Sequence, residues 1–368
     1  MSKAAELASL IGNINAGGGT SNKNLFINGA VTVSQRNGTT VSSGNNYAAM
    51  PDMFRTSAYA TSTYQQSTDA PSGFTNSLKV NCNNSSSPNS TQTYRIECGI
   101  EGQNIAHLLY GTSDAKTATL SFYVKSSVTG VYSAALVNVA PGNASSQIAS
   151  SATRSHIKTY TISSANTWEY KTLTFPGCPN GTWGNSNGNG ISVVFDLGSG
   201  STHQGAVDTW LSTSDTIASN QTLFGSNNGG TWQITGIQFE VGQNATAFDH
   251  EPFEKTLKKC QRYFYKFGGQ NSFEHIPGIG QGNGSTFSTH YQHPVPMRTG
   301  PTLNLGGDWR INDSYLGSYY TFSGVGIDNA TTLTCRVYGN TSSAIGSDLG
   351  RILAYNDISA KWEHSAEM

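Results

Sequence analysis

Apolar residues recur at every second position along most of the chain, in short runs separated by glycine, asparagine, serine and threonine. The run over residues 118–125, ATLSFYVK, shows the pattern most clearly. A period of two is typical of a strand with one buried face, because successive side chains of a strand point to opposite sides. Similar runs are found at residues 25–33, 77–82, 94–98, 131–137, 158–162, 168–175, 191–196 and 232–241. We therefore expect about ten strands and no long helix over residues 23–254, which predicts an antiparallel, jelly-roll-like β-sandwich.

The spacing of these runs predicts how some of the strands are connected. Residues 118–125 and 131–137 are separated by a short segment that contains Thr129 and Gly130, so we expect the two runs to form a hairpin. Two long polar stretches, residues 176–190 and 198–230, interrupt the strand pattern. We expect both stretches to be loops at one end of the sandwich, where sequence variation is tolerated and binding sites are often found.

The last run of the sandwich changes phase at a glycine. Apolar residues occupy the even positions Trp232 and Ile234 before Gly236, and the odd positions 237, 239 and 241 after it. One extra residue in a strand shifts the alternation in this way, so the sequence predicts a β-bulge at Gly236. Glu240 lies between two of the apolar residues, and we expect its side chain to face away from the core and to bond to a neighbouring loop.

The first 22 residues differ from the rest of the chain. Residues 3–11, KAAELASLI, have the apolar spacing of a short helix, with Leu7, Leu10 and Ile11 on one face. A glycine-rich stretch at residues 15–21 follows and has the composition of a flexible linker. A helix of this length is unstable alone in water, so we expect its apolar face to pack on another surface and interpret it as an attachment peptide. The alternative is a frayed terminus.

Beyond residue 254 the pattern restarts, which indicates a second domain over residues 255–368. Residues 256–265 read as a short amphipathic segment that changes into an aromatic strand. Further strands are expected at residues 286–293, 318–322, 331–337, 351–357 and 359–367. No internal repeat of the solenoid kind occurs, so we expect a compact, β-rich C-terminal domain.

The composition indicates a folded, polar and nearly uncharged protein. Charged residues make up 12% of the chain, and the formal net charge is −1 with an isoelectric point of about 6.7. Aromatic residues make up 10%, whereas disordered chains usually have few aromatic residues and a high net charge. This charge balance gives no reason to expect nucleic acid binding. No apolar run approaches the roughly 20 residues of a membrane-spanning helix, and none near Met1 resembles a signal peptide, so we expect neither membrane insertion nor Sec export.

No catalytic motif is present in the sequence. The chain lacks a G-x-S-x-G elbow, a P-loop and an H-E-x-x-H pair. Cleavage of a polysaccharide requires two carboxylates held about 5–10 Å apart, and the acidic residues here are thinly spread. Those that a fold could bring together are Glu97, Glu101, Asp196, Asp208 and Glu240. We expect a protein without enzymatic activity.

Aromatic residues in polar segments are the candidates for ligand binding. An aromatic ring can stack on a sugar, and neighbouring amide or carboxylate groups can bond to the sugar's hydroxyl groups. Trp183 lies in the asparagine- and glycine-rich stretch of residues 179–185. The other candidates are grouped beside polar residues in the C-terminal domain: Trp309, Tyr315, Tyr319 and Tyr320. The alternative is that these rings fix loops to the edge of the fold. Trp168 and Trp232, which lie in strands, are expected in the core.

Five segments, in their order and spacing, resemble a family of bacteriophage virion proteins. They are NLFINGAVTVSQRNG at residues 24–38, YRIECGIEG at residues 94–102, ATLSFYVKSS at residues 118–127, the stretch of residues 231–267, and SAEM at residues 365–368. The family consists of tail-fibre or receptor-binding proteins. In these proteins a β-sandwich similar to carbohydrate-binding modules precedes a small C-terminal β-domain.

The resemblance implies a homotrimer on the exterior of a phage particle, made in the host cytoplasm. It implies adhesion to host cell-surface polysaccharide, with Leu7, Leu10 and Ile11 binding other virion proteins. A capsid decoration or head-fibre protein with the same sandwich is the first alternative, and a glycan-degrading tail spike is the second. A free-standing lectin would require a signal for secretion.

Neither a metal nor a cofactor is expected. The five cysteines are widely spaced without a C-x-x-C pair, which favours buried thiols over disulfides or zinc ligands: Cys82, Cys98, Cys178, Cys260 and Cys335. His290 and His293 form an H-x-x-H pattern on an expected strand, where the two side chains point to opposite faces. Carbohydrate-binding jelly rolls often hold a calcium ion with an acidic residue of the first strand, and Ala30 takes that place here.

Overall fold

The chain divides into two compact units, Met1–Thr256 with Met368, and Leu257–Glu367. The computed structural model describes residues 23–143, 150–269, 271–276, 279–313, 318–345, 349–355 and 359–368, together with Lys3 and Asp357. The attachment peptide predicted from Leu7, Leu10 and Ile11 lies outside the described residues. None of the helices in the described part has the length and apolar character that crossing a lipid bilayer requires.

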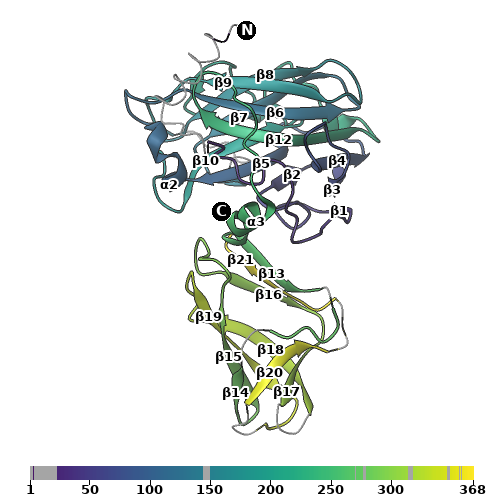
Figure 1. Cartoon of the computed structure of the whole chain (residues 1–368). Coiled ribbons are helices and arrows are strands. Elements are labelled where there is room, and N and C mark those ends of the chain that lie inside the picture. Colours follow the sequence, from purple (N-terminus) through teal and green to yellow (C-terminus); the bar gives the residue numbers. More distant parts are fainter. Residues whose placement is uncertain are drawn as a thin grey trace. The chain divides into compact units, whose positions relative to one another are not determined.

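The described residues of the N-terminal unit form a sandwich of two six-stranded sheets (Figure 1). Neighbouring strands within each sheet are antiparallel. The first sheet contains, in order, β1 (Ser42–Ser43), β3 (Thr61–Ser67), β4 (Ser77–Asn84), β12 (Thr231–Val241), β6 (Ala118–Ser126) and β9 (Glu169–Phe175). The second contains β11 (Trp210–Leu211), β8 (Ser155–Ile162), β7 (Gly130–Val137), β10 (Asn189–Asp196), β5 (Tyr94–Glu101) and β2 (Arg55–Ala58). The predicted jelly-roll-like sandwich is confirmed.

The core of this unit consists of the inward-facing residues of both sheets. On β6 the alternate residues Leu120, Phe122 and Val124 are fully buried, as the period-two pattern predicts. The ring of Phe122 meets that of Phe195 on β10 edge-on, with the centroids 5.1 Å apart. Trp232 of β12 is also fully buried, so its predicted place in the core is confirmed.

The predicted hairpin between residues 118–125 and 131–137 is wrong. β6 lies between β12 and β9 in one sheet, whereas β7 lies between β8 and β10 in the other. The segment that contains Thr129 and Gly130 therefore crosses from one sheet to the other. Alternation shows that each run is a strand with a buried face, but the same pattern is compatible with either sheet.

The first predicted strand, residues 25–33, is also absent, although the segment lies beside β12. The amide of Leu25 donates to the carbonyl of Phe239, and that of Ile237 donates to the carbonyl of Gly29. Between these two contacts Asn28 has a φ of 59°, which interrupts an extended backbone. The Asn28 side chain then bonds to the backbone of Val33, at 2.9 Å to its carbonyl and 3.0 Å from its amide. Asparagine tolerates this left-handed conformation better than most residues, so a turn replaces the strand.

The predicted bulge in β12 is confirmed. The register with β6 shifts between Thr235 and Gln238, and Gly236 has a φ of 63°. Before the bulge Trp232 and Ile234 point inward, and after it Ile237 and the other odd-numbered residues do. The bulge therefore keeps the apolar side chains of an eleven-residue strand on the core side.

The polar stretch at residues 198–230 is not a plain loop. It contains η3 (Ser201–His203), β11 and η4 (Phe224–Ser226), and it buries Ile217 and Phe224. A second short insertion, α2 (Gly102–Ile105) followed by η1 (Ala106–Leu108), comes directly after β5. These segments extend the core beyond the regular strands.

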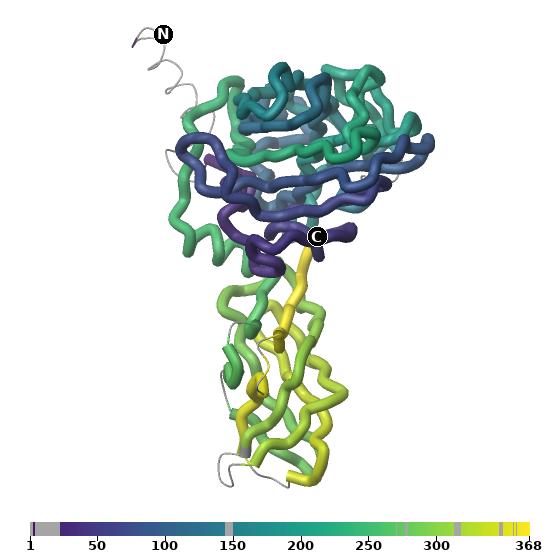
Figure 2. The backbone as a smooth tube through the Cα atoms, turned by 90° about the vertical axis from the view of Figure 1, so that its right-hand side faces the viewer, coloured from purple at the N-terminus to yellow at the C-terminus, as the bar shows by residue number. Residues whose placement is uncertain are grey.

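The C-terminal unit combines a small sheet with a barrel (Figure 1), and Figure 2 traces the same part of the chain in green to yellow. Helix α3 (Phe253–Gln261) leads into the first strand, which agrees with the amphipathic segment and aromatic strand predicted there. The three-stranded sheet contains β13 (Phe264–Gly268), β21 (Lys361–Ser365) and β16 (Thr302–Gly306). The closed barrel contains β14 (Gly280–Asn283), β15 (Thr286–Gln292), β19 (Thr334–Thr341), β18 (Tyr319–Asp328), β17 (Trp309–Asp313) and β20 (Leu349–Ala354).

One apolar core fills this second unit. It includes Phe287, Trp309, Val337 and Trp362, which come from both the barrel and the three-stranded sheet. The rings of Trp309 and Trp362 meet edge-on, with the centroids 5.4 Å apart. All five cysteines of the chain are buried and form no disulfide within the described residues, as the sequence predicts.

Candidate functional site

A groove of about 490 Å³ lies on the outer face of the sheet that contains β12, β6 and β9. Because Leu120, Phe122 and Val124 of β6 point to the core, the alternate residues Ser121 and Tyr123 point outward into the groove. The groove is further lined by Tyr170 of β9, by Gly236 of β12, and by two loop segments, residues 72–74 and residues 245–248 with His250.

Two tyrosines form an aromatic surface in the groove. Tyr123 and Tyr170 are register partners on β6 and β9, and their ring centroids lie 4.9 Å apart. Tyr170 is 47% exposed, so one face of this pair is open to solvent. On the other side Phe74 lies against Tyr123, with 5.5 Å between the ring centroids. The result is a row of three rings along the groove.

The bulge at Gly236 makes room for this row. A Cβ atom at position 236 would lie 2.7 Å from Cζ of Phe74 and 3.1 Å from Cδ2 of Tyr123. Residue 236 also has a left-handed φ, which glycine adopts without strain. A single glycine therefore both corrects the phase of the strand and allows Phe74 to pack against the sheet.

The second wall of the groove is held by side chains of β12 that point outward. Glu240 accepts a hydrogen bond from the amide of Thr246 at 2.8 Å and another from its hydroxyl group at 2.7 Å. Gln238 accepts one from the amide of Asp249 at 2.8 Å. The predicted role of Glu240, bonding to a neighbouring loop, is confirmed. The loop places Phe248 edge-on to Phe74, with 5.0 Å between the ring centroids.

A polar cluster lies on the same face of the sheet, next to Tyr123 along β6. Asp69 pairs with Lys125, accepts from Gln233 at 3.1 Å and accepts from the indole of Trp168 at 3.4 Å. Burial alone would raise the pKa of Asp69, but the hydrogen bonds from Lys125 and Gln233 outweigh it and hold the pKa below its usual value. Trp168 is only partly buried and has Lys125 5.1 Å from its ring centroid, so the prediction that it lies in the core is wrong.

This arrangement suits a ligand with both apolar faces and hydroxyl groups. The exposed ring of Tyr170 offers a stacking surface, and Asp69 and Lys125 offer an acceptor and a donor. A shallow groove with aromatic lining and a few polar groups is the usual form of a site for an organic ligand.

The five acidic residues named as candidates for catalysis each have a partner of their own. Glu97 pairs with Arg55 at 2.7 Å, and Asp196 pairs with Arg95 at 3.0 Å. The remaining contacts are Glu101 with Gln103 at 2.6 Å, Asp208 with Lys158 at 2.6 Å, and Glu240 with Thr246 as described above. These contacts give each carboxylate a structural role.

The aromatic residues selected from the sequence lie elsewhere. Trp183 packs edge-on against Tyr110 and Trp210, with centroid distances of 4.8 and 5.6 Å, and its indole donates to the carbonyl of Asn180 at 3.0 Å. These contacts fix its loop to the fold, which is the alternative that the sequence left open. Trp309 is 1% exposed and donates to the carbonyl of Gly306, so the structure places it in the core of the C-terminal unit, out of reach of a surface ligand.

Of the three tyrosines selected in the C-terminal unit, Tyr319 is exposed and packs on Tyr355, with 4.9 Å between the ring centroids. Tyr320 is partly buried against the apolar core, and Tyr315 lies outside the described residues. Trp183 belongs to the N-terminal unit, whereas Tyr319 and Tyr320 belong to the C-terminal unit. The sequence analysis did not select Tyr123 and Tyr170, although both stand at outward positions of clearly alternating strands.

The solved structures that are similar to this chain include the following three. One is a protein from Bacteroides thetaiotaomicron to which sugar binding has been ascribed, with 12% identity and a TM-score of 0.36, covering 60% of this chain and 100% of that one. Another is the enzymatically active domain of tailspike protein 4 from bacteriophage CBA120, with 14% identity and a TM-score of 0.29, covering 60% of this chain and 22% of that one. The third is a family 11 carbohydrate-binding module from Clostridium thermocellum in complex with a mixed-linked tetrasaccharide, with 10% identity and a TM-score of 0.28, covering 56% and 98%.

At these identities and TM-scores the likeness carries no argument about function. No protein-family model matches the chain. No curated protein matches it either.

Proposed function

We propose that this chain is a non-enzymatic structural protein of a bacteriophage particle, a tail fibre or adhesin that binds glycans of the host surface. The observation that carries the proposal is the outward-facing pair of Tyr123 and Tyr170 in the groove of the sandwich. The role in a virion rests on the sequence resemblance described above.

The exposure of Tyr170 supports a binding role for the groove. A tyrosine ring that served only the fold would gain more from burial, because apolar area removed from water stabilises a protein by about 25 cal/mol per Å². Here the fold leaves Tyr170 47% exposed, and its ring packs on Tyr123, which in turn packs on Phe74. A sugar ring stacked on Tyr170 would cover this exposed surface, and its hydroxyl groups would lie near the polar cluster around Asp69.

The low charge of the chain agrees with a neutral or weakly charged glycan as the ligand. The net charge is −1, and Lys125 and Asp69 of the neighbouring polar cluster form an ion pair. A strongly anionic polymer would be expected to require a basic surface. We therefore assign the groove to uncharged segments of host polysaccharide.

The position in the particle and the oligomeric state are parts of the same proposal. We assign attachment to other virion proteins to Leu7, Leu10 and Ile11, and we propose a homotrimer. Light scattering of the purified full chain measures the oligomeric state, since a trimer has three times the mass of the chain. Mass spectrometry of purified phage particles tests whether the protein is part of the particle, because a virion protein is retained after the particles are banded in a density gradient.

Binding to host cells tests the adhesive function. Fluorescently labelled full chain is incubated with a panel of bacterial strains, before and after periodate oxidation of the cell-surface sugars. We expect binding to at least one strain, a loss of most of that binding after oxidation, and no release of reducing sugar from the cells during the incubation. Binding that survives oxidation would indicate a protein receptor, and release of sugar would indicate an enzyme.

A further inference from the structure

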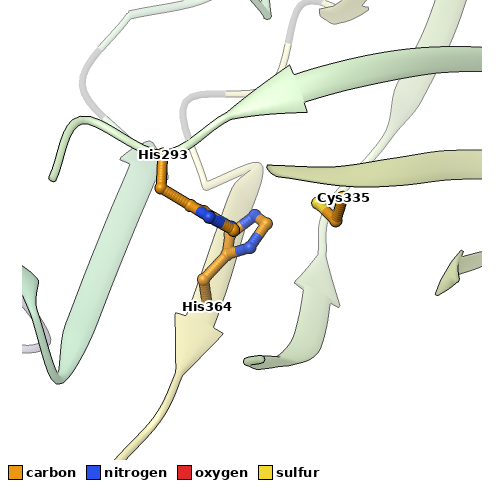
Figure 3. A group of neighbouring side chains, drawn as sticks. All are labelled: His293, Cys335 and His364. Carbon is orange, nitrogen blue, oxygen red and sulfur yellow. The ribbon is translucent and has the colours of Figure 1, made fainter. Parts of the chain in front are cut away.

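Two histidines and a cysteine meet inside the C-terminal unit (Figure 3). His293 directly follows β15, Cys335 is the second residue of β19, and His364 is on β21. Their ligating atoms, an imidazole nitrogen from each histidine and the sulfur of the cysteine, all lie within 4.8 Å of one another. The three residues are far apart in the sequence and come from both the barrel and the three-stranded sheet.

Backbone pairing fixes the three residues in these positions. Cys335 stands opposite Tyr291 in the ladder between β15 and β19, which places it close to His293 two residues further on. The amide of His293 donates to the carbonyl of Leu333 at 2.9 Å, which continues the pairing past the end of β15. His364 is in the central strand of the three-stranded sheet, where it is paired on both sides. The cluster therefore belongs to the rigid part of the unit.

All three side chains are buried, with exposed fractions of 4% for His293 and 1% each for Cys335 and His364. Both ring nitrogens of His293 and Nδ1 of His364 have no hydrogen-bond partner among the described residues. Leaving a buried polar group without a partner costs about 1–3 kcal/mol, and native proteins avoid it. Ring stacking of His364 on Tyr291, with 5.2 Å between centroids, does not satisfy these nitrogens. No side chain of the described residues bonds to these three nitrogens, so they are available to a ligand.

We propose that His293, Cys335 and His364 bind a zinc ion that holds the barrel and the three-stranded sheet of the C-terminal unit together. Imidazole nitrogen and thiolate sulfur are the ligands that zinc prefers in proteins. With Zn–N distances of about 2.0 Å and Zn–S distances of about 2.3 Å, tetrahedral ligand atoms lie roughly 3–4 Å apart, so the observed cluster needs to contract by about 1 Å. Three protein ligands leave the fourth position to a water molecule.

All three side chains of the cluster can bind zinc directly. A neutral imidazole has a lone pair on one ring nitrogen, so His293 and His364 can each give one nitrogen ligand. A cysteine binds zinc as the thiolate, so zinc binding forms the Zn–S bond and releases the thiol proton of Cys335 to solvent. A zinc ion bound by residues of three different chain segments acts as a cross-link between them.

Zinc analysis of the purified full chain tests the proposal. The chain is purified without chelator from cells grown with zinc, and bound metal is measured by mass spectrometry for the wild type and for His293→Gln, Cys335→Ser and His364→Gln. The controls are His290→Gln, which changes an exposed histidine of the same strand, and Cys260→Ser, which changes a buried cysteine of the same unit. We expect one zinc per chain in the wild type and in both controls, and a loss of at least tenfold in the three cluster variants.

Thermal unfolding of the wild type gives a second measurement that does not depend on whether a variant folds. At zinc concentrations about a hundredfold above the dissociation constant, the melting temperature of the C-terminal unit should rise by roughly 10 °C over the chelated protein. Cobalt added to the chelated protein should produce the near-ultraviolet absorption of a thiolate bound to Co(II). Wild-type protein that binds no zinc and shows neither change would overturn the proposal. So would a Cys335→Ser variant that keeps its zinc, and copper found in place of zinc would overturn the assignment of the ion.

Discussion

Tyr170 on β9 lies directly opposite Tyr123 on β6, with 4.9 Å between their ring centroids and about half of the Tyr170 side chain open to solvent. Cross-strand aromatic pairs of this kind contribute to sheet stability, but an exposed member contributes little through burial. The position of Tyr170 is therefore better suited to contacts with a ligand than to stabilising the sandwich.

Replacement of Tyr170 with alanine tests this relationship. We expect Tyr170→Ala to weaken binding to host cells roughly tenfold, which corresponds to the loss of one stacking contact of about 1.4 kcal/mol. The melting temperature of the sandwich should fall by no more than a few degrees. Tyr319→Ala is the matched control, because Tyr319 is 45% exposed in the other unit, against 47% for Tyr170. The groove is the wrong site if Tyr319→Ala, and not Tyr170→Ala, reduces binding.

Gly236 provides a test of how the groove is built. Gly236→Ala introduces a Cβ atom 2.7 Å from the Phe74 ring, at a residue whose φ is 63°. We expect the backbone strain and the displaced ring to reduce the free energy of unfolding by about 1–3 kcal/mol and to weaken glycan binding. Gly229→Ala is the control, because Gly229 has a φ of 74° but nothing within 4 Å of the added atom.

Denaturant unfolding of the two glycine variants, with cell binding measured in parallel, separates the two effects. Gly229→Ala should show the cost of the strained backbone alone and keep full binding. Equal binding by the Gly236→Ala variant and the wild type would show that the position of Phe74 does not matter for the groove.

Local patterns in the sequence predicted the strands and the bulge, but not how the strands are placed in the sheets. Each alternating run between residues 77 and 241 became a strand, because alternation records which side chains face the core. The same alternation does not say which sheet a strand joins, and so the hairpin between residues 118–125 and 131–137 was wrong. Residues 25–33 have the composition of a strand, yet they form a left-handed turn at Asn28. This turn depends on backbone bonds to β12, which is distant in the sequence, and on a side-chain bond to Val33, which follows no regular pattern.

The candidate sites show the same limit of local reasoning. The polar neighbours of Trp183 and Trp309 predict a binding role, but both indoles donate to backbone carbonyls of their own segments. Tyr123 and Tyr170 become neighbours only through the pairing of β6 with β9. Likewise His293 and Cys335 come together through the ladder of β15 and β19, and no sequence spacing marks them.

The buried pair of Arg95 and Asp196 predicts a large loss of stability. Both side chains are fully buried, with 3.0 Å between Arg95 Nε and Asp196 Oδ2. Asp196 also accepts from the hydroxyl groups of Ser199 and Thr216, at 2.8 and 2.7 Å. Removing one partner of a buried pair costs about 3–5 kcal/mol, so Asp196→Ala should reduce the free energy of unfolding of the sandwich by that amount.

An exposed ion pair of the same unit provides the control for Asp196. Asp208 pairs with Lys158, and their side chains are 64% and 24% exposed. Surface pairs contribute about 0–1 kcal/mol, so Lys158→Ala should have little effect when both variants are unfolded in urea. Similar losses of unfolding free energy in both variants would show that the buried network stabilises the sandwich no more than an exposed ion pair does.

His156 predicts a dependence of stability on pH. Its ring is fully buried between Phe175 and Trp210, and burial together with the nearby Lys158 lowers its pKa to about 4, with Asp208 opposing the shift. The unfolded chain binds a proton at the ordinary pKa of about 6.5, so between these two values the unfolded state holds more protons than the folded state. Stability is therefore present above pH 6.5 and is lost as the pH falls towards 4.

His156→Phe isolates this contribution. Between pH 7 and pH 5 the wild-type sandwich should lose about 2 kcal/mol through His156, and the variant should lack this part of the loss. The measurement is urea unfolding at several pH values, followed by a signal from the sandwich. A variant with the same pH dependence as the wild type would mean that other groups, such as the buried His203, account for the whole effect.

The most direct test of glycan binding in the groove is a crystal structure of the full chain with an oligosaccharide prepared from a strain that the protein binds. We predict a sugar ring stacked on Tyr170 beside Tyr123, with hydroxyl groups near Asp69 and Lys125. A sugar bound at another surface, with the groove empty, would contradict it.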